Sequence, residues 1–238
     1  LFRKIITNYY HMKRVLVSLI CVYLCIVAWA QNDDFVQYQL DNGLTVYLWE
    51  DHDQPDVQGW TVTRAGSIDE PANATGLAHY LEHMLFKGTD RIGALDWEKE
   101  QPLYEQIIAL YDTLALTTDA KAREAVQLRI NEVSLEAAKY AAPDEFSNLI
   151  QGIGGEGLNA FTAYDVTCYM NSFPSYQMER WLTLYADRLT NPVFRSFQAE
   201  LENVFEEYNM YLDDNSTHTR NFIFGKLYEG HAYARDII

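Results

Sequence analysis

Apolar and polar residues alternate along residues 36–48, with one interruption at Asn42-Gly43. A period of two residues is typical of a strand with one buried face, and Asn-Gly is a preferred pair for a two-residue hairpin turn. The pattern therefore predicts a β-hairpin, and residues 57–64 predict a further strand. The alternating apolar positions of the hairpin are Val36, Tyr38, Leu40, Leu44, Val46 and Leu48.

The spacing of apolar residues becomes helical after a loop at residues 66–75. Thr75 is the predicted N-cap of a helix that runs to about Phe86. Gly88 suits the position just beyond the C-terminus of that helix, where the backbone often turns left-handed.

Residues 96–141 predict two long, polar helices. Pro102 suits the first turn of one helix, and the Thr-Thr-Asp triplet at residues 117–119 separates it from the next. The many charged residues of this region indicate the solvated faces of a helical hairpin rather than a functional site.

The rest of the chain predicts one strand and two more helices. Residues 152–157 are rich in glycine, but no Lys-Ser or Lys-Thr pair follows, so they are not a phosphate-binding loop. Residues 158–173 predict one extended strand. Pro174 opens a helix that ends before Pro192, and another helix begins near Phe197. The predicted inward residues of these helices are Met178, Trp181, Leu182, Tyr185, Leu201, Val204, Phe205, Tyr208 and Leu212.

The N-terminus has the pattern of a secretion signal that begins at Met12, so residues 1–11 precede the expected start. Two basic residues are followed by an apolar run at residues 15–27 and by Ala28-Trp29-Ala30, a cleavage pattern before Gln31. The apolar run is short for a membrane span, so no stable span is expected after cleavage; an uncleaved anchor is the alternative. We therefore expect export to the periplasm or the extracellular space.

Removal of the signal changes the cysteine count and the charge. Cys21 and Cys25 leave with the signal, so Cys168 is alone and no internal disulfide is expected. The net charge of −16 becomes more negative, because the signal region holds four basic residues and no acidic ones. Such a surface repels nucleic acid, which excludes nucleic acid as an expected partner.

The segment His79-Tyr80-Leu81-Glu82-His83 reads H-x-x-E-H, the inverted form of a zinc-peptidase signature. Positions i and i+4 share one face of a helix, so both histidines can bind one metal ion. Glu82 lies on the same side, where it can take a proton from a water that the metal activates. The alternative is a pair of core histidines, because the same helix carries Leu77, Leu81, Met84, Leu85 and Phe86.

A second acidic segment follows on the helix from Phe197. Glu200 and Glu207 are seven residues apart, which is about two helical turns, so they lie nearly above one another. Acidic residues on a helix are usually only solvated. A metal site with two histidines, however, also needs a third protein ligand and an outer partner.

Three separated motifs together resemble the pitrilysin/insulin-degrading family of inverted-motif zinc metallopeptidases. They are His79-Tyr80-Leu81-Glu82-His83, Gly157-Leu158-Asn159-Ala160-Phe161-Thr162 and Glu200-Leu201-Glu202-Asn203-Val204-Phe205-Glu206-Glu207. Their order matches the family, and they span most of the chain after the signal. Gly230-His231-Ala232-Tyr233 also resembles a family segment, with alanine where proline is usual.

The resemblance implies an α+β fold, in which helices pack on one face of a mixed, mainly antiparallel sheet. It implies one Zn²⁺ per catalytic unit, bound by His79, His83 and Glu207, with Glu82 as the general base. Glu200 would support a histidine ligand from outside the metal shell. We choose Glu207 over Glu206 because Glu206 would point about 100° away from Glu200.

The same resemblance implies a peptide-binding edge strand at Asn159, Ala160, Phe161 and Thr162. Family members usually have several such units, so residues 31–238 are expected to be an incomplete N-terminal catalytic unit. The missing C-terminal half is then a partner of this segment, and the isolated fragment is expected to be inactive. The helical hairpin at about 96–141 is interpreted as an insertion that leaves the site intact.

These observations predict an exported zinc metalloendopeptidase that hydrolyses peptide bonds in peptides or small unfolded proteins. A first alternative is a catalytically silent peptide-binding subunit of a processing complex with the same fold. The presence of all three ligands and the base argues against it. A structural exported domain with incidental histidines is a second alternative, which the order of the three motifs disfavours.

Overall fold

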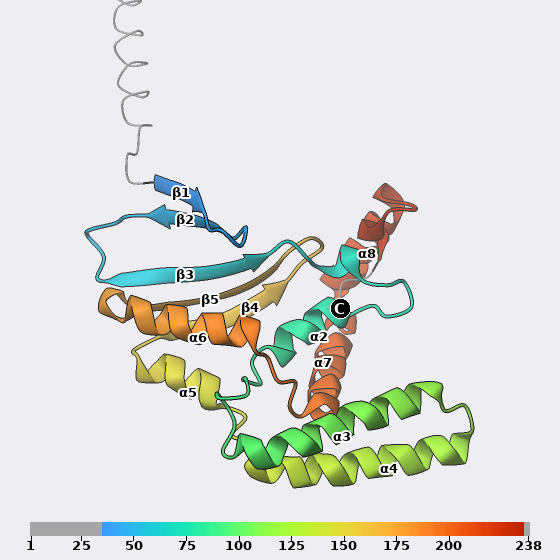
Figure 1. The fold of residues 1–238 in the computed structure, drawn as a ribbon. Coiled ribbons are helices and arrows are strands. Elements are labelled where there is room, and N and C mark those ends of the chain that lie inside the picture. Colours follow the sequence, from blue (N-terminus) through green and yellow to red (C-terminus); the bar gives the residue numbers. More distant parts are fainter. Residues whose placement is uncertain (1–34, 236–238) are drawn as a thin grey trace, which may run out of the picture. The chain divides into compact units, whose positions relative to one another are not determined.

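The computed structural model describes residues 35–235 (Figure 1). The predicted signal, its cysteines and its cleavage site lie outside the described residues. Contacts divide the chain into two units at the boundary between Gln54 and Pro55, and the described part of each unit is presented by itself. Among residues 35–235, no helix is both long enough and apolar enough to cross a membrane.

The described part of the first unit is the predicted hairpin. Strands β1 (Phe35–Gln39) and β2 (Thr45–Trp49) pair in antiparallel register. The turn closes with a hydrogen bond of 2.8 Å from the Leu40 amide to the Leu44 carbonyl. Gly43 has a φ of 89°, a left-handed conformation that glycine adopts without steric cost. The prediction made from the alternation and from Asn42-Gly43 is confirmed.

The second unit is built on a three-stranded antiparallel sheet in the order β3-β5-β4. Its strands are β3 (Asp56–Thr63), β4 (Glu156–Thr162) and β5 (Thr167–Pro174). The single strand predicted for residues 158–173 is wrong, because the chain reverses at residues 163–166. The Ala163 amide donates to the Val166 carbonyl at 2.8 Å and closes this turn.

One face of this sheet is covered by helices α5 (Glu145–Gly152) and α6 (Met178–Thr190) (Figure 1). Asn171 of β5 anchors α6, because its Oδ1 accepts hydrogen bonds from the Trp181 indole at 2.9 Å and the Tyr185 hydroxyl at 2.8 Å. Only glycine fits at position 59, where a Cβ would lie 2.4 Å from the Trp181 ring. The core under these helices comprises Ile92, Phe146, Ile150, Tyr169, Phe173, Trp181 and Tyr185.

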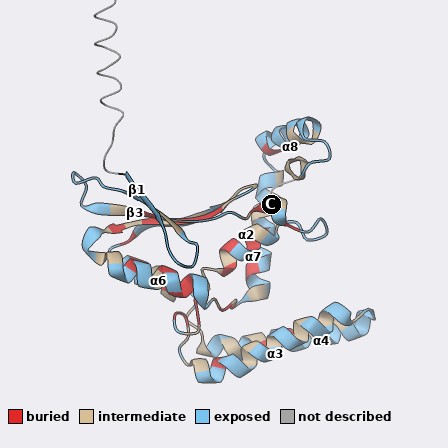
Figure 2. Cartoon of the chain, turned by 45° about the horizontal axis from the view of Figure 1, so that its top comes forward, coloured by how far each residue is buried: buried red, intermediate tan, exposed pale blue. Residues whose placement is uncertain are grey.

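Helices α2 (Leu77–Met84) and α7 (Phe197–Leu212) pack against one another and form a second buried cluster. Tyr80, Met84 and Val204 make up its centre, and the Tyr80 hydroxyl donates a hydrogen bond to the Phe197 carbonyl. Three residues predicted to point inward are instead exposed, as the burial colours of Figure 2 illustrate for their helices: Leu182, Leu201 and Phe205.

The N-terminus of α2 differs from the prediction. Gly76, with a φ of 89°, is the N-cap, and Thr75 is not. The Glu70 carboxylate serves instead of a cap side chain, since it accepts from the amides of Gly76 at 2.9 Å and Ala78 at 2.7 Å. Gly88 does adopt a left-handed φ of 92°, but in the turn beyond the helix end rather than next to it.

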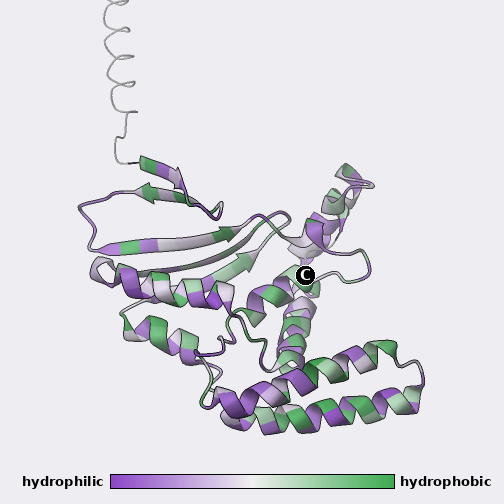
Figure 3. Ribbon diagram, in the orientation of Figure 1, coloured by the Kyte–Doolittle hydropathy of each residue, from purple (hydrophilic) through white to green (hydrophobic). Residues whose placement is uncertain are grey.

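Helices α3 (Trp97–Leu116) and α4 (Ala120–Ala137) form the predicted helical hairpin (Figure 1). Asp119 separates them and caps α4, because its side chain accepts from the Ala122 amide at 2.9 Å. Pro102 lies inside α3 and not in its first turn. Figure 3 shows hydrophilic and hydrophobic residues interspersed along both helices, as expected for a largely solvated pair.

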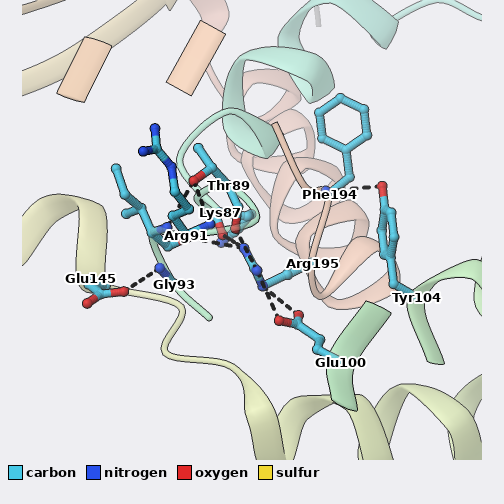
Figure 4. Close-up of polar contacts among 10 residues, drawn as sticks. Lys87, Thr89, Arg91, Gly93, Glu100, Tyr104, Glu145, Phe194 and Arg195 are labelled. Atoms are coloured by element: carbon cyan, nitrogen blue, oxygen red, sulfur yellow. Dashed lines mark hydrogen bonds and ion pairs between the residues drawn. The ribbon is translucent and has the colours of Figure 1, made fainter. Parts of the chain in front are cut away.

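The base of the hairpin is tied to the core by a buried ion pair between Glu100 and Arg195 (Figure 4). Arg195 Nε lies 2.6 Å from one oxygen of the Glu100 carboxylate, and Nη2 lies 3.0 Å from the other. The same guanidinium donates to three backbone carbonyls in the segment that follows α2. These belong to Lys87 at 3.1 Å, Thr89 at 2.7 Å and Ile92 at 3.3 Å.

The described chain ends with α8 (Asn215–Leu227) and a short 3₁₀ turn, η4 (Ala232–Ala234). Asp214 caps α8 by accepting from the Ser216 amide at 3.0 Å. The three-stranded antiparallel sheet with helices packed on it confirms the predicted α+β class. The strands of the described residues form two separate sheets, in which each pairing is antiparallel.

Candidate metal centre

Helices α2 and α7 bring together the three side chains that the sequence predicts as metal ligands. His79 and His83 lie one turn apart on α2, and their Nε2 atoms are 3.1 Å from each other. Glu207 Oε2 lies 3.5 Å from each of these two nitrogens. Neighbouring Glu206 is exposed and is not part of this group. Within the part of the chain that the structure describes, His79, His83 and Glu207 are the only cluster of three potential metal ligands.

The spacing of these atoms fits a tetrahedral ion. Zinc binds histidine nitrogen and carboxylate oxygen at about 2.0–2.1 Å, so two ligands of a tetrahedral ion lie about 3.3 Å apart. The three observed separations are 3.1, 3.5 and 3.5 Å. These separations are compatible with one such ion held by His79, His83 and Glu207, with a fourth coordination position left for another ligand.

Glu200 orients His83 from the side away from this cluster. Its Oε1 lies 2.8 Å from His83 Nδ1, and its Oε2 pairs with Lys87 and accepts from the Asn203 side-chain amide at 3.2 Å. Burial raises the pKa of Glu200, but hydrogen bonds from Lys87 and His83 outweigh it and hold the pKa below its ordinary value. In the tautomer in which Nδ1 donates to this carboxylate, Nε2 offers its lone pair to the cluster.

His79 is also held in the form that binds metal. Burial, followed by the nearby His83, lowers the pKa of His79. Its imidazole is therefore neutral at neutral pH, and Nε2 can offer a lone pair. The buried Nδ1 has no hydrogen-bond partner among residues 35–235, so no carboxylate supports His79 in the way that Glu200 supports His83.

Glu82 connects the motif helix to the edge of the sheet. It is buried, with 6% of its surface exposed, and its Oε2 accepts a hydrogen bond from the Thr162 hydroxyl at the end of β4. This contact joins two of the predicted motifs directly. The H-x-x-E-H pattern and the 159–162 segment give no local indication of it.

A cavity of about 550 Å³ lies over the cluster. Its walls combine the predicted residues with Phe86, Leu158, Ala163, Tyr211 and Arg220. Sequence reasoning did not single out Tyr211 or Arg220. Tyr211 could have been found, because it lies one turn after Glu207 on the same helix face. Arg220 lies on α8, and no spacing rule links it to the motifs.

Strand β4 forms the wall of this cavity with Asn159, Ala160, Phe161 and Thr162. One edge of β4 pairs with β5, and among the described residues no strand pairs with its other edge. An unpaired edge can accept an extended peptide through backbone hydrogen bonds. The structure thus joins a three-ligand cluster, a buried carboxylate and an open strand edge in one cavity.

Comparison with known proteins adds the following. The family model described as Insulinase (Peptidase family M16) matches residues 45–101 and 123–238. "Probable zinc protease PqqL" of Escherichia coli (strain K12) is 22% identical over 196 residues, which covers 80% of this chain and 16% of that protein.

Two solved structures share the fold. The crystal structure of the periplasmic protease PqqL from Escherichia coli has a TM-score of 0.59 at 20% identity, and covers 87% of this chain and 18% of that one. The crystal structure of pitrilysin has a TM-score of 0.57 at 19% identity, with coverage of 86% and 17%. The chain therefore spans less than a fifth of the length of each of these relatives.

Proposed function

The chain belongs to the insulinase family of peptidases, family M16, and from this premise we propose that the full-length protein is a zinc-dependent metalloendopeptidase. Its substrates are peptides or small unfolded proteins. One observation carries the proposal: ligand atoms of His79, His83 and Glu207 lie within 4.8 Å of one another, and Glu82 lines the same cavity. The name of the relative PqqL, a probable zinc protease, supports zinc as the metal.

In this proposal His79, His83 and Glu207 hold one zinc ion. When bound there, zinc supplies a Lewis acid that polarises the scissile carbonyl and activates a water molecule. Glu82 takes the proton from the attacking water and then delivers it to the leaving amine. The Thr162 hydroxyl donates a hydrogen bond to Glu82, which fixes the position of the carboxylate in the cavity.

The open edge of β4 positions the substrate. A peptide that pairs with Asn159, Ala160, Phe161 and Thr162 through its backbone runs past Glu82, because Thr162 already contacts that carboxylate. Backbone pairing requires no particular side chains, so this arrangement accepts many sequences. The register in which the substrate pairs with β4 then sets which of its peptide bonds lies next to the metal cluster.

Three further statements belong to the same proposal. The protein is exported, in line with the predicted signal and with a relative whose crystal structure is described as periplasmic. The rest of the full-length chain is the partner that completes the substrate chamber. The hairpin at about 96–141 is an insertion in this proposal. The family model leaves residues 102–122 unmatched, which supports an insertion over that part, while it matches residues 96–101 and 123–141.

The test is Glu82→Gln in the full-length protein. The amide keeps the shape of the side chain but cannot accept the proton, so peptide hydrolysis should fall by at least about 100-fold while the zinc content stays unchanged. Glu202→Gln, an exposed change on α7 outside the cavity, is the matched control and should leave both values unchanged.

The same experiment decides between the enzyme and the silent peptide-binding subunit. A wild-type protein that binds peptide and never cleaves it would support the subunit. Near-normal turnover by Glu82→Gln would remove Glu82 from the role of base.

A further inference from the structure

Arg220 is the one arginine or lysine among the described side chains that line the cavity. It is exposed and forms no ion pair with any described residue. Its hydrogen bonds within the described part of the chain are two long contacts of 3.4 Å, from Nε and Nη2 to Oδ1 of the adjacent Asn221. The guanidinium therefore keeps most of its donors available for a ligand in the cavity.

The position of Arg220 is set by the packing of α8. Thr217 on this helix is buried, and the Phe224 ring lies 5.8 Å from the ring of Tyr164. Arg220 and Phe224 are one turn apart and share a helix face. Tyr164 lies just beyond the end of β4 at Thr162, so α8 holds Arg220 at the Thr162 end of the cavity.

The charges around Arg220 make this position distinctive. The acidic side chains of the cavity are Glu82, Glu200 and Glu207, and the whole chain carries a formal net charge of −16. Lys87, which lies close to the site, is already paired with Glu200. Within the described part of the chain, Arg220 is thus the cationic group that an acidic part of a bound peptide would meet.

We propose that Arg220 forms a carboxylate-binding subsite at the Thr162 end of the cavity. Its ligand is an acidic side chain, or the free C-terminal carboxylate, of a peptide lying along β4. The planar guanidinium presents two parallel N–H groups that match a carboxylate, whereas lysine presents only a point charge. This subsite deepens the proposed peptidase function and rests on it for the peptide path along β4.

The test measures peptide binding separately from hydrolysis. In the full-length, zinc-loaded protein, Glu82→Gln serves as the background for binding measurements, because the peptides then stay intact. A set of peptides carries a single Glu, or Gln in its place, at successive positions on both sides of the scissile bond. A second pair differs only in a free or an amidated C-terminus, which distinguishes the two sources of the carboxylate. Dissociation constants are compared with and without Arg220→Gln.

We expect the Glu peptide to bind about fivefold more tightly than the Gln peptide at one position, or the free C-terminus to bind more tightly than the amide. Arg220→Gln should reduce this ratio to about one, and Arg220→Lys should retain part of it. Arg180→Gln, an exposed arginine on α6 outside the cavity, should leave the ratio unchanged. In protein that retains Glu82, Arg220→Gln should raise the KM of the preferred peptide and leave kcat unchanged.

The outcomes separate the subsite from the peptidase function. Equal ratios in the protein that keeps Arg220 and in the Arg220→Gln variant would overturn the subsite. Equal loss in the Arg180→Gln control, or no binding of either peptide, would overturn it as well. Failure of the proposed peptidase function would show instead as wild-type protein that leaves every peptide intact, while the binding comparison still reports on Arg220.

Discussion

Glu100→Gln tests how the helical hairpin is joined to the rest of the second unit. Both side chains of the Glu100–Arg195 pair are 3% exposed, and they meet through two hydrogen bonds of 2.6 and 3.0 Å. The amide leaves the Arg195 charge buried and uncompensated. Loss of one partner of such a pair costs about 3–5 kcal/mol of unfolding free energy. With a urea m-value of about 2 kcal/mol/M, the unfolding midpoint should fall by roughly 1.5–2.5 M.

The matched control is Glu132→Gln, which removes one partner of the exposed pair Arg129–Glu132 on α4. Its N–O distance is 2.9 Å, but its side chains are 52% and 66% exposed, so the expected loss is at most about 0.5 kcal/mol. The assay is urea unfolding of the wild type and both variants, followed by circular dichroism. If Glu100→Gln unfolded within about 0.5 kcal/mol of the wild type, the pair would not anchor the hairpin.

The remaining predictions concern the metal ligands and the segment itself. Glu207→Gln should lower zinc affinity sharply in a competition titration and Glu206→Gln should not; equal retention in both would refute the choice of Glu207. Glu200→Gln should cost about 10–100-fold in affinity, because His83 loses its support; an unchanged affinity would contradict that role. Residues 31–238 alone should not hydrolyse peptides even with zinc, and turnover comparable to the full-length protein would argue against a required second half.

Residues linked by local spacing were predictable from the sequence. His79 and His83 share a helix face by the i, i+4 rule, and the interval between Glu200 and Glu207 places both on one side of α7. The Asn42-Gly43 turn and the Asp119 cap follow from equally local rules. The structure brings the predicted ligands together, because both motifs lie on helices, α2 and α7, that pack against one another.

The errors arise where distant contacts replace local ones. Thr75 is a good cap residue, but the Glu70 carboxylate already satisfies the amides at the start of α2. The turn at residues 163–166 lies between strands rich in β-forming residues, and the reversal is shown by its hydrogen bond and by the antiparallel pairing of β4 with β5. The Glu100–Arg195 pair and the Thr162–Glu82 contact could not be predicted either, because their partners are 95 and 80 residues apart in the sequence and no local spacing rule links them.

The central claim is that this cluster holds a zinc ion on which peptide hydrolysis depends, and a titration of stripped protein tests it directly. Full-length wild-type protein is freed of metal with a chelator, and peptide hydrolysis is followed as zinc is returned. Hydrolysis should disappear on stripping and return fully at one equivalent of zinc per chain, with no recovery in a His79→Ala, His83→Ala double variant. Full hydrolysis by protein that contains no bound metal would contradict it.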